Sequence, residues 1–185
     1  MKTKMLLLFM VLSLTGMAQT NWSIDKSHSN IRFTTKHMMI SEVDGYFSEF
    51  DGSMTNSTEE LNGSTIEFTA KVASINTGND RRDDHLKSDD FFNAEAYPEI
   101  KFTGTLKKEG DQYFLVGDFT MRDVTKAVKF DVKFNGTIGK KAGFKITGVV
   151  DRFDYGLKWD RAMETGGLVV ARDVKIVCNV QMNSM

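Results

Sequence analysis

The residues best suited to chemistry lie in one short segment, RDDHLKSDDFF, which runs from Arg82 to Phe92. The guanidinium of Arg82 is suited to pairing with a phosphate or to donating hydrogen bonds to a ligand carbonyl. An ion pair with Asp83 or Asp90 would instead lock the segment in place. His85 is a candidate general base, although charged residues around a histidine on a short helix usually form a solvated face. The segment therefore predicts either a ligand contact or a structural latch.

The sequence offers little else for catalysis or metal binding. His28, His37 and His85 do not have the spacing of metal ligands, and Cys178 falls in an apolar strand pattern. No Gly-x-Ser-x-Gly motif supports a serine hydrolase. We therefore expect no catalytic residue, no metal and no cofactor, and we interpret Cys178 as a small core residue.

The N-terminus has the features of a secretory signal peptide. Lys2 and Lys4 precede an apolar run over residues 5–14, and the small residues Gly16 and Ala18 match a cleavage site. The run is shorter than the roughly 20 residues that span a bilayer. We expect residues 1–18 to be cleaved, leaving residues 19–185 as one periplasmic or secreted domain with no integral membrane segment.

Composition narrows the partners of this domain. The chain has 24 Lys and Arg against 25 Asp and Glu, a net charge of −1, and its basic residues are not clustered. Nucleic acid is therefore not an expected partner. The single cysteine cannot form an intramolecular disulfide, so stability must come from packing.

Most of the chain alternates between apolar and polar residues, the pattern of strands with one buried face. Eight strands are expected, which favours an all-β, closed antiparallel barrel. A short helix ending near Ser88 and a long loop, together residues 79–98, separate the third strand from the fourth. The expected strands contain Ile31 and Phe33, Val43 and Phe47, and residues 66–72, 100–106, 113–121, 128–134, 144–150 and 174–182.

The barrel interior is expected either to be filled or to hold one ligand, since both occur at this size. Gly45, Gly104, Gly117 and Gly148 fall in the inward phase, where they either open a tunnel or relieve bending of the strands. A tunnel with aromatic walls would suit a long apolar ligand. The expected lining is Phe33, Phe47, Phe68, Ile100, Phe102, Leu115, Gly117, Phe119, Phe130, Phe144 and Ile146. The expected head-group or rim contacts are Arg82, Asp83, His85, Phe91 and Phe92.

Ordered motifs along residues 22–156 resemble the YceI-like family of exported bacterial proteins. The resemblance implies a lipocalin-like barrel that holds a polyisoprenoid or similar long-chain amphiphile. Asp123, Ala127 and residues 171–173 depart from the family pattern in loops, which affects the expected shape of one barrel mouth. The motifs include Trp22-Ser23-Ile24-Asp25, Thr77-Gly78, Arg82-Asp83, His85-Leu86-Lys87-Ser88, Asp90-Phe91-Phe92, Tyr97-Pro98-Glu99-Ile100-Lys101-Phe102, Gly117-Asp118-Phe119-Thr120 and Arg152-Phe153-Asp154-Tyr155-Gly156.

The leading hypothesis is an exported protein that sequesters a polyisoprenoid or similar lipid without covalent chemistry. The first alternative is a stress-response or protein-interaction barrel with a filled core and no lipid. A hydrolase that uses His85 with a neighbouring carboxylate is the second. A homodimer is compatible with all three.

Overall fold

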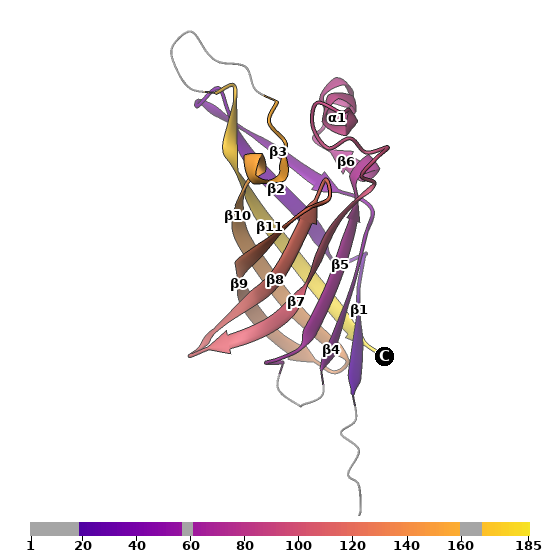
Figure 1. The fold of residues 1–185 in the computed structure, drawn as a ribbon. Coiled ribbons are helices and arrows are strands. Elements are labelled where there is room, and N and C mark those ends of the chain that lie inside the picture. The colour runs from indigo at the N-terminus through magenta and orange to yellow at the C-terminus, as the bar shows by residue number, and fades with distance from the viewer. Residues whose placement is uncertain (1–18, 57–60, 160–167) are drawn as a thin grey trace, which may run out of the picture.

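The computed structural model describes residues 19–56, 61–159 and 168–185. Its strands form one antiparallel sheet that closes through the pairing of β1 with β11 (Figure 1). The predicted signal peptide, residues 1–18, lies outside the described residues. The elements are β1 (Thr20–Ile24), β2 (Asn30–His37), β3 (Ser41–Phe47), β4 (Phe50–Asn56), β5 (Thr65–Lys71), the 3-10 helix η1 (Val72–Ser74), β6 (Ile75–Asn76), α1 (Asp80–Lys87), β7 (Glu99–Glu109), β8 (Gln112–Met121), β9 (Val124–Ile138), β10 (Lys141–Asp151), the 3-10 helix η2 (Arg152–Tyr155) and β11 (Val170–Ser184).

The predicted closed barrel of eight antiparallel strands is confirmed, and its first three strands are interrupted. β1 and β2 follow one another along the same edge of β11, and they pair in turn with β4 and β3. β5 and β6 continue this arrangement on the far side of β4 and β3. The barrel therefore has three long strands with a break, formed by β1 and β2, by β3 and β4, and by β5 and β6. Strands β7 to β11 complete an up-and-down meander.

Two of the interruptions lie against each other and share a serine. The hydroxyl of Ser74 donates to the carbonyl of Lys71 at 2.7 Å and accepts the N–H of Glu49 at 3.0 Å. The N–H of Ser48 donates to the carbonyl of Ser74 at 3.2 Å. Ser74 thus replaces part of the hydrogen bonding that the ladder loses where these strands break.

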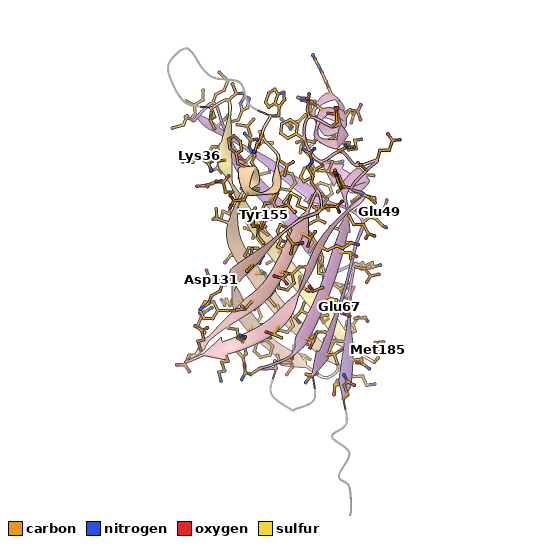
Figure 2. All side chains as sticks on the ribbon, in the orientation of Figure 1. Lys36, Glu49, Glu67, Asp131, Tyr155 and Met185 are labelled. Carbon is orange, nitrogen blue, oxygen red and sulfur yellow. The ribbon has the colours of Figure 1, made fainter. Side chains whose placement is uncertain are left out.

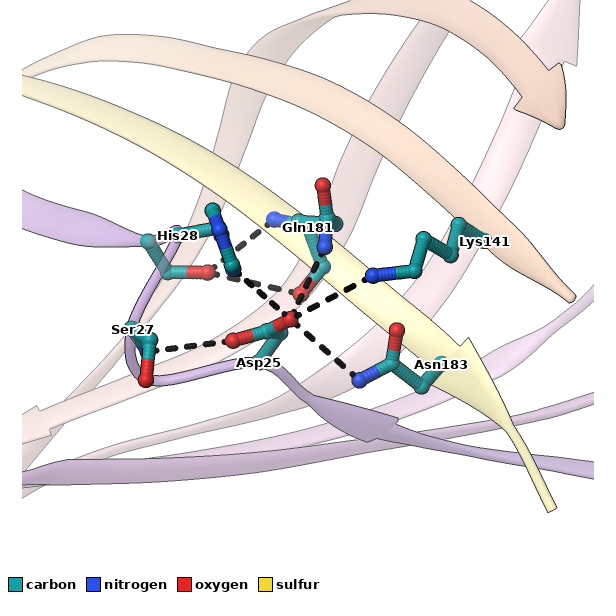
Figure 3. Close-up of polar contacts among 7 residues, drawn as sticks. Asp25, Ser27, His28, Lys141, Gln181 and Asn183 are labelled. Carbon is teal, nitrogen blue, oxygen red and sulfur yellow. Dashed lines mark hydrogen bonds and ion pairs between the residues drawn. The ribbon is translucent and has the colours of Figure 1, made fainter.

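The remaining interruption, between β1 and β2, is held by Asp25 (Figure 3). Its carboxylate accepts hydrogen bonds from the N–H of Ser27 at 3.1 Å, from Nδ1 of His28 at 3.0 Å and from the Gln181 amide at 2.8 Å. Partial burial opposes ionisation, but hydrogen bonds from His28 and Asn183 and the charge of His28 lower the pKa of Asp25 to about 2. Asp25 therefore joins the bend in the first strand to the last strand.

The helix α1 and the loop after it connect β6 to β7 and so separate the third long strand from the fourth, as predicted. The side chain of Asn79 accepts the N–H of Arg82 at 3.0 Å, which satisfies one of the free donors at the helix start. At the helix end, the N–H of Ser88 donates to the carbonyl of His85. In Figure 1, α1 lies at one end of the barrel, at the same end as the β2–β3 hairpin and opposite the C-terminus.

The barrel interior contains two groups of buried side chains, one along most of its length and one at the end farthest from α1. The first group includes Ile31, Phe47, Ile100, Phe102, Phe119, Phe130, Tyr155 and Cys178. The second consists of Trp22, Met54, Leu61, Leu106, Val132, Ala142, Phe144 and Met182.

Candidate functional site

An apolar cavity runs inside the barrel and has a volume of about 220 Å³. At the end near α1 its wall includes Leu86 and Leu157, and at the other end it reaches Met54 and Met182. Its lining surface is almost wholly apolar, because alternate residues of each strand face inward and nearly all of these are hydrophobic. The interior is therefore not completely filled by side chains.

Nearly all the residues predicted to line a tunnel have side chains on this cavity wall. Their contact with a ligand stays a prediction. These residues are Phe33, Phe47, Phe68, Ile100, Phe102, Leu115, Phe119, Phe130, Phe144 and Ile146.

Of the two roles expected for the inward glycines, their surroundings speak against the opening of a tunnel. A Cβ on Gly45 would fall within 3.0 Å of the Phe33 ring, and one on Gly148 would meet the Phe130 ring in the same way. Gly117 is not part of the cavity wall, and a Cβ there would collide with the backbone of the facing strand β7. These glycines admit rings and close strand contacts instead of opening a tunnel. Enlarging Gly117 would consequently disturb the fold itself.

The cavity is closed by side chains at the end away from α1. Met54, Leu106 and Val132 are each no more than 2% exposed there. Trp22 packs over the same group, and its indole N–H donates to the side-chain oxygen of Asn56 at 2.9 Å. We therefore take the end beside α1 as the candidate mouth of the cavity.

At the mouth, the predicted rim residues divide into two groups. Phe91 and Phe92 lie on the cavity wall. Arg82 and Asp83 do not lie on the wall, and both contact Thr77 instead. The Arg82 guanidinium donates to the hydroxyl and to the carbonyl of Thr77, each at 2.7 Å, and Asp83 accepts the N–H of Thr77 at 2.9 Å. Arg82 therefore stabilises the start of α1 through Thr77, and not through the ion pair with Asp83 or Asp90 that we considered.

His85 lies at the mouth but outside the cavity wall. Its Nε2 is 2.9 Å from a carboxylate oxygen of Asp90, and its ring packs edge-on against Phe91 and Trp159 at centroid distances of 5.0 and 5.1 Å. Phe91 and Trp159 are themselves 5.2 Å apart. The three rings form one aromatic cluster beside the mouth. Trp159 was not predicted, because it lies in a stretch rich in charge and glycine that lacks the strand alternation.

Arg152 is a second residue at this end that was not among the predicted rim contacts. It is only 4% exposed and lies on the cavity wall. Its guanidinium donates to the backbone carbonyls of Leu157, Trp159, Val170 and Ala171, at 2.8 Å for Trp159 and 3.0 Å for Val170. It thereby ties the chain after η2 to the start of β11. Arg152 belongs to the Arg152–Gly156 motif noted in the sequence, but the motif did not indicate that Arg152 binds these carbonyls.

Burial shifts the pKa of two side chains in the barrel interior, Cys178 and Tyr155. Burial raises the pKa of the Cys178 thiol to about 12, so the thiol on the cavity wall is neutral at physiological pH. Burial also raises the pKa of the Tyr155 phenol to about 12, with a contribution from Asp154. The buried position of Cys178 agrees with its interpretation as a small core residue. Within the described ranges, no three His, Cys, Asp or Glu side chains gather as a metal-binding group.

The fold and the cavity define a closed antiparallel β-barrel with an apolar interior. The chain belongs to the YceI-like family, since the YceI-like domain matches residues 22–182. A UPF0312 protein of Staphylococcus aureus is 36% identical over 172 residues, which cover 89% of this chain and 98% of the relative.

Solved structures have the same barrel. A YceI protein of Campylobacter jejuni is 30% identical, with a TM-score of 0.69 over 80% of this chain and 88% of that one. BcnA of Burkholderia cenocepacia has a TM-score of 0.76 at 21% identity, over 85% of this chain and 98% of its own. A polyisoprenoid-binding domain of Saccharophagus degradans has a TM-score of 0.69 at 14% identity, over 89% and 98% respectively. The last two show the fold alone.

Proposed function

We propose that this protein is an exported binding protein that encloses a polyisoprenoid or similar long-chain amphiphile in its barrel. The apolar cavity that runs from Leu86 to Met182 is the observation that carries this proposal. The polyisoprenoid-binding domain that shares the fold offers a precedent for the ligand class.

The chemistry of the wall favours a long hydrocarbon chain. Burial of each methylene contributes about 0.8 kcal/mol, whereas a sugar or nucleotide would lose hydrogen bonds that this wall cannot replace. A covalent reaction would require a reactive polar group, and the only thiol on the wall, Cys178, is held neutral by burial. We therefore propose that the protein binds its ligand without catalysing a reaction.

The polar end of the ligand would lie at the mouth, beside the cluster of His85, Phe91 and Trp159. Phe91 and Phe92 would contact the first part of the chain, because both lie on the cavity wall. His85 belongs to this cluster and pairs with Asp90 at 2.9 Å, so this pair would supply polar contacts to the head group. Arg82 and Asp83 would support them by holding α1 in place through Thr77.

Export is proposed from residues 1–18, whose pattern is that of a signal peptide. Among the described residues, none of the helices is long and apolar enough to cross a membrane. A homodimer stays a prediction, which light scattering on the purified protein would test.

The test is to extract purified protein with organic solvent, identify any lipid by mass spectrometry, and measure binding of an added fluorescent prenyl alcohol. Ile146→Trp should fill the cavity and abolish binding, because Ile146 faces the cavity. Lys145→Trp is the matched control, since this neighbouring residue of β10 is exposed and points outward. Absence of lipid together with no prenyl binding by the unmodified protein would refute the proposal and favour the barrel that acts only in protein interactions.

A further inference from the structure

The turn between β2 and β3 exposes a group of large apolar side chains. Met38 is 45% exposed, Met39 70% and Ile40 86%. The N–H of Ile40 closes the turn on the carbonyl of His37, and both central methionines have left-handed backbones, with φ of 51° and 63°. Residues with a Cβ adopt this conformation unfavourably, and Asn-Gly is the usual choice for such a turn. The sequence thus keeps large apolar residues where small polar ones fit better.

This turn continues directly from the wall of the cavity. The N–H of Met38 donates to the carbonyl of Val169 at 2.8 Å, and His37 pairs with Val170. Val170 and Thr35 both lie on the cavity wall. In Figure 1 the hairpin projects beyond the barrel at the α1 end, and Figure 2 labels Lys36 close to its tip. The exposed apolar residues therefore stand beside the mouth.

We propose that the hairpin tip, Met38–Ile40, inserts into the surface of a lipid bilayer and seats the cavity mouth on the membrane. This inference rests on the proposed function, because an apolar ligand of the cavity would be exchanged with a bilayer. Methionine and isoleucine on a narrow tip can enter the boundary between head groups and acyl chains.

Charge and size favour a bilayer over a second protein chain. Beyond His37, the first charged residues on either side of the tip are Lys36 and Glu42, which are register partners of opposite sign on β2 and β3. Insertion should therefore depend on apolar burial and not on anionic lipid. A stable protein interface buries about 800 Å² on each partner, more than three side chains on a turn supply.

The test is flotation of the purified protein with phosphatidylcholine vesicles. The triple variant Met38→Asn, Met39→Gly, Ile40→Thr gives the turn its preferred residues, so it should fold at least as well as the parent. We expect it to weaken vesicle binding by about tenfold or more. The control is Ile138→Thr, which removes an apolar residue as exposed as Ile40 at the β9–β10 turn, at the closed end of the barrel. It should bind vesicles as the parent does.

A vesicle-free measurement separates this proposal from the proposed function. A fluorescent prenyl alcohol added from ethanol should bind the triple variant and the parent equally, while its transfer from vesicles should slow only for the triple variant. The tip proposal is overturned if the parent binds the probe but not the vesicles, or if the triple variant and the parent bind vesicles equally. It is also overturned if the triple variant only dissociates a dimer in light scattering. Failure of the parent to bind the probe at all would refute the proposed function instead.

Discussion

The ring of Phe130 covers Gly148 so closely that no side chain can replace the glycine's hydrogen without moving the ring. Phe130 also packs against Phe102 at 6.4 Å and Phe119 at 6.0 Å between ring centroids, so it cannot move alone. All three rings lie on the cavity wall. The glycine therefore helps to shape the cavity by positioning a ring that projects into it.

Gly148→Ala is expected to destabilise the protein by about 1–3 kcal/mol, the usual effect of overpacking. Phe130→Leu introduced into the same chain should recover part of this loss, because a smaller side chain leaves room for the methyl group. Gly143→Ala is the control on the same strand, since its Cβ would meet Asn135 at an ordinary 3.5 Å. Urea unfolding measures all of these. Equal effects at Gly148 and Gly143 would contradict the role assigned to the Phe130 ring.

Arg152→Leu is expected to destabilise the mouth, because several backbone carbonyls would lose their donor. Each buried acceptor left unsatisfied costs about 1–3 kcal/mol, so a total of about 2–4 kcal/mol is expected after partial relaxation. Arg172→Leu is the matched control. Both guanidinium groups lie over the ring of Phe153, at 4.7 and 4.8 Å from its centroid, but Arg172 is exposed and pairs with Asp151. Its loss should cost less than about 1 kcal/mol, as measured by urea unfolding.

Asp25 should contribute to acid sensitivity in a defined range. Its pKa is lowered to about 2, so its contribution to stability is complete above its ordinary value of 3.8 and is lost as pH falls toward 2. Asp25→Asn should therefore reduce the dependence of unfolding free energy on pH between about 4 and 2. Carboxyl NMR titration of the unmodified protein gives a direct check, and a midpoint at the ordinary value for Asp25 would contradict the prediction.

The two tryptophans should report differently on ligand binding. Trp159 belongs to the aromatic cluster at the mouth, whereas Trp22 packs at the closed end. A prenyl alcohol bound with its polar end at the mouth should change the emission of Trp159. This change should persist in Trp22→Phe and disappear in Trp159→Phe. The opposite pattern would place the polar end of the ligand at the closed end.

The alternation of apolar and polar residues was sufficient to predict the barrel and most of its strands, but not β1 and β4. Phe33, Phe102 and Phe144 could be assigned to the interior because side chains alternate across a strand whatever its neighbours are. The helix end near Ser88 was predictable for a similar reason, because capping and helix charge act locally. The breaks in the first three strands were not visible, since their hydrogen bonds join residues such as Asp25 and Gln181 that are far apart in sequence.

The sequence by itself determined the number of strands, their antiparallel order and the apolar character of the interior, because these follow from local periodicity and short connections. Only the tertiary structure decided what each polar residue contacts. In the tertiary structure Arg82 donates to Thr77, His85 packs against Trp159, and Arg152 donates to backbone carbonyls. The physical reason is that a long side chain selects its partner by distance in space, and barrel closure sets that distance.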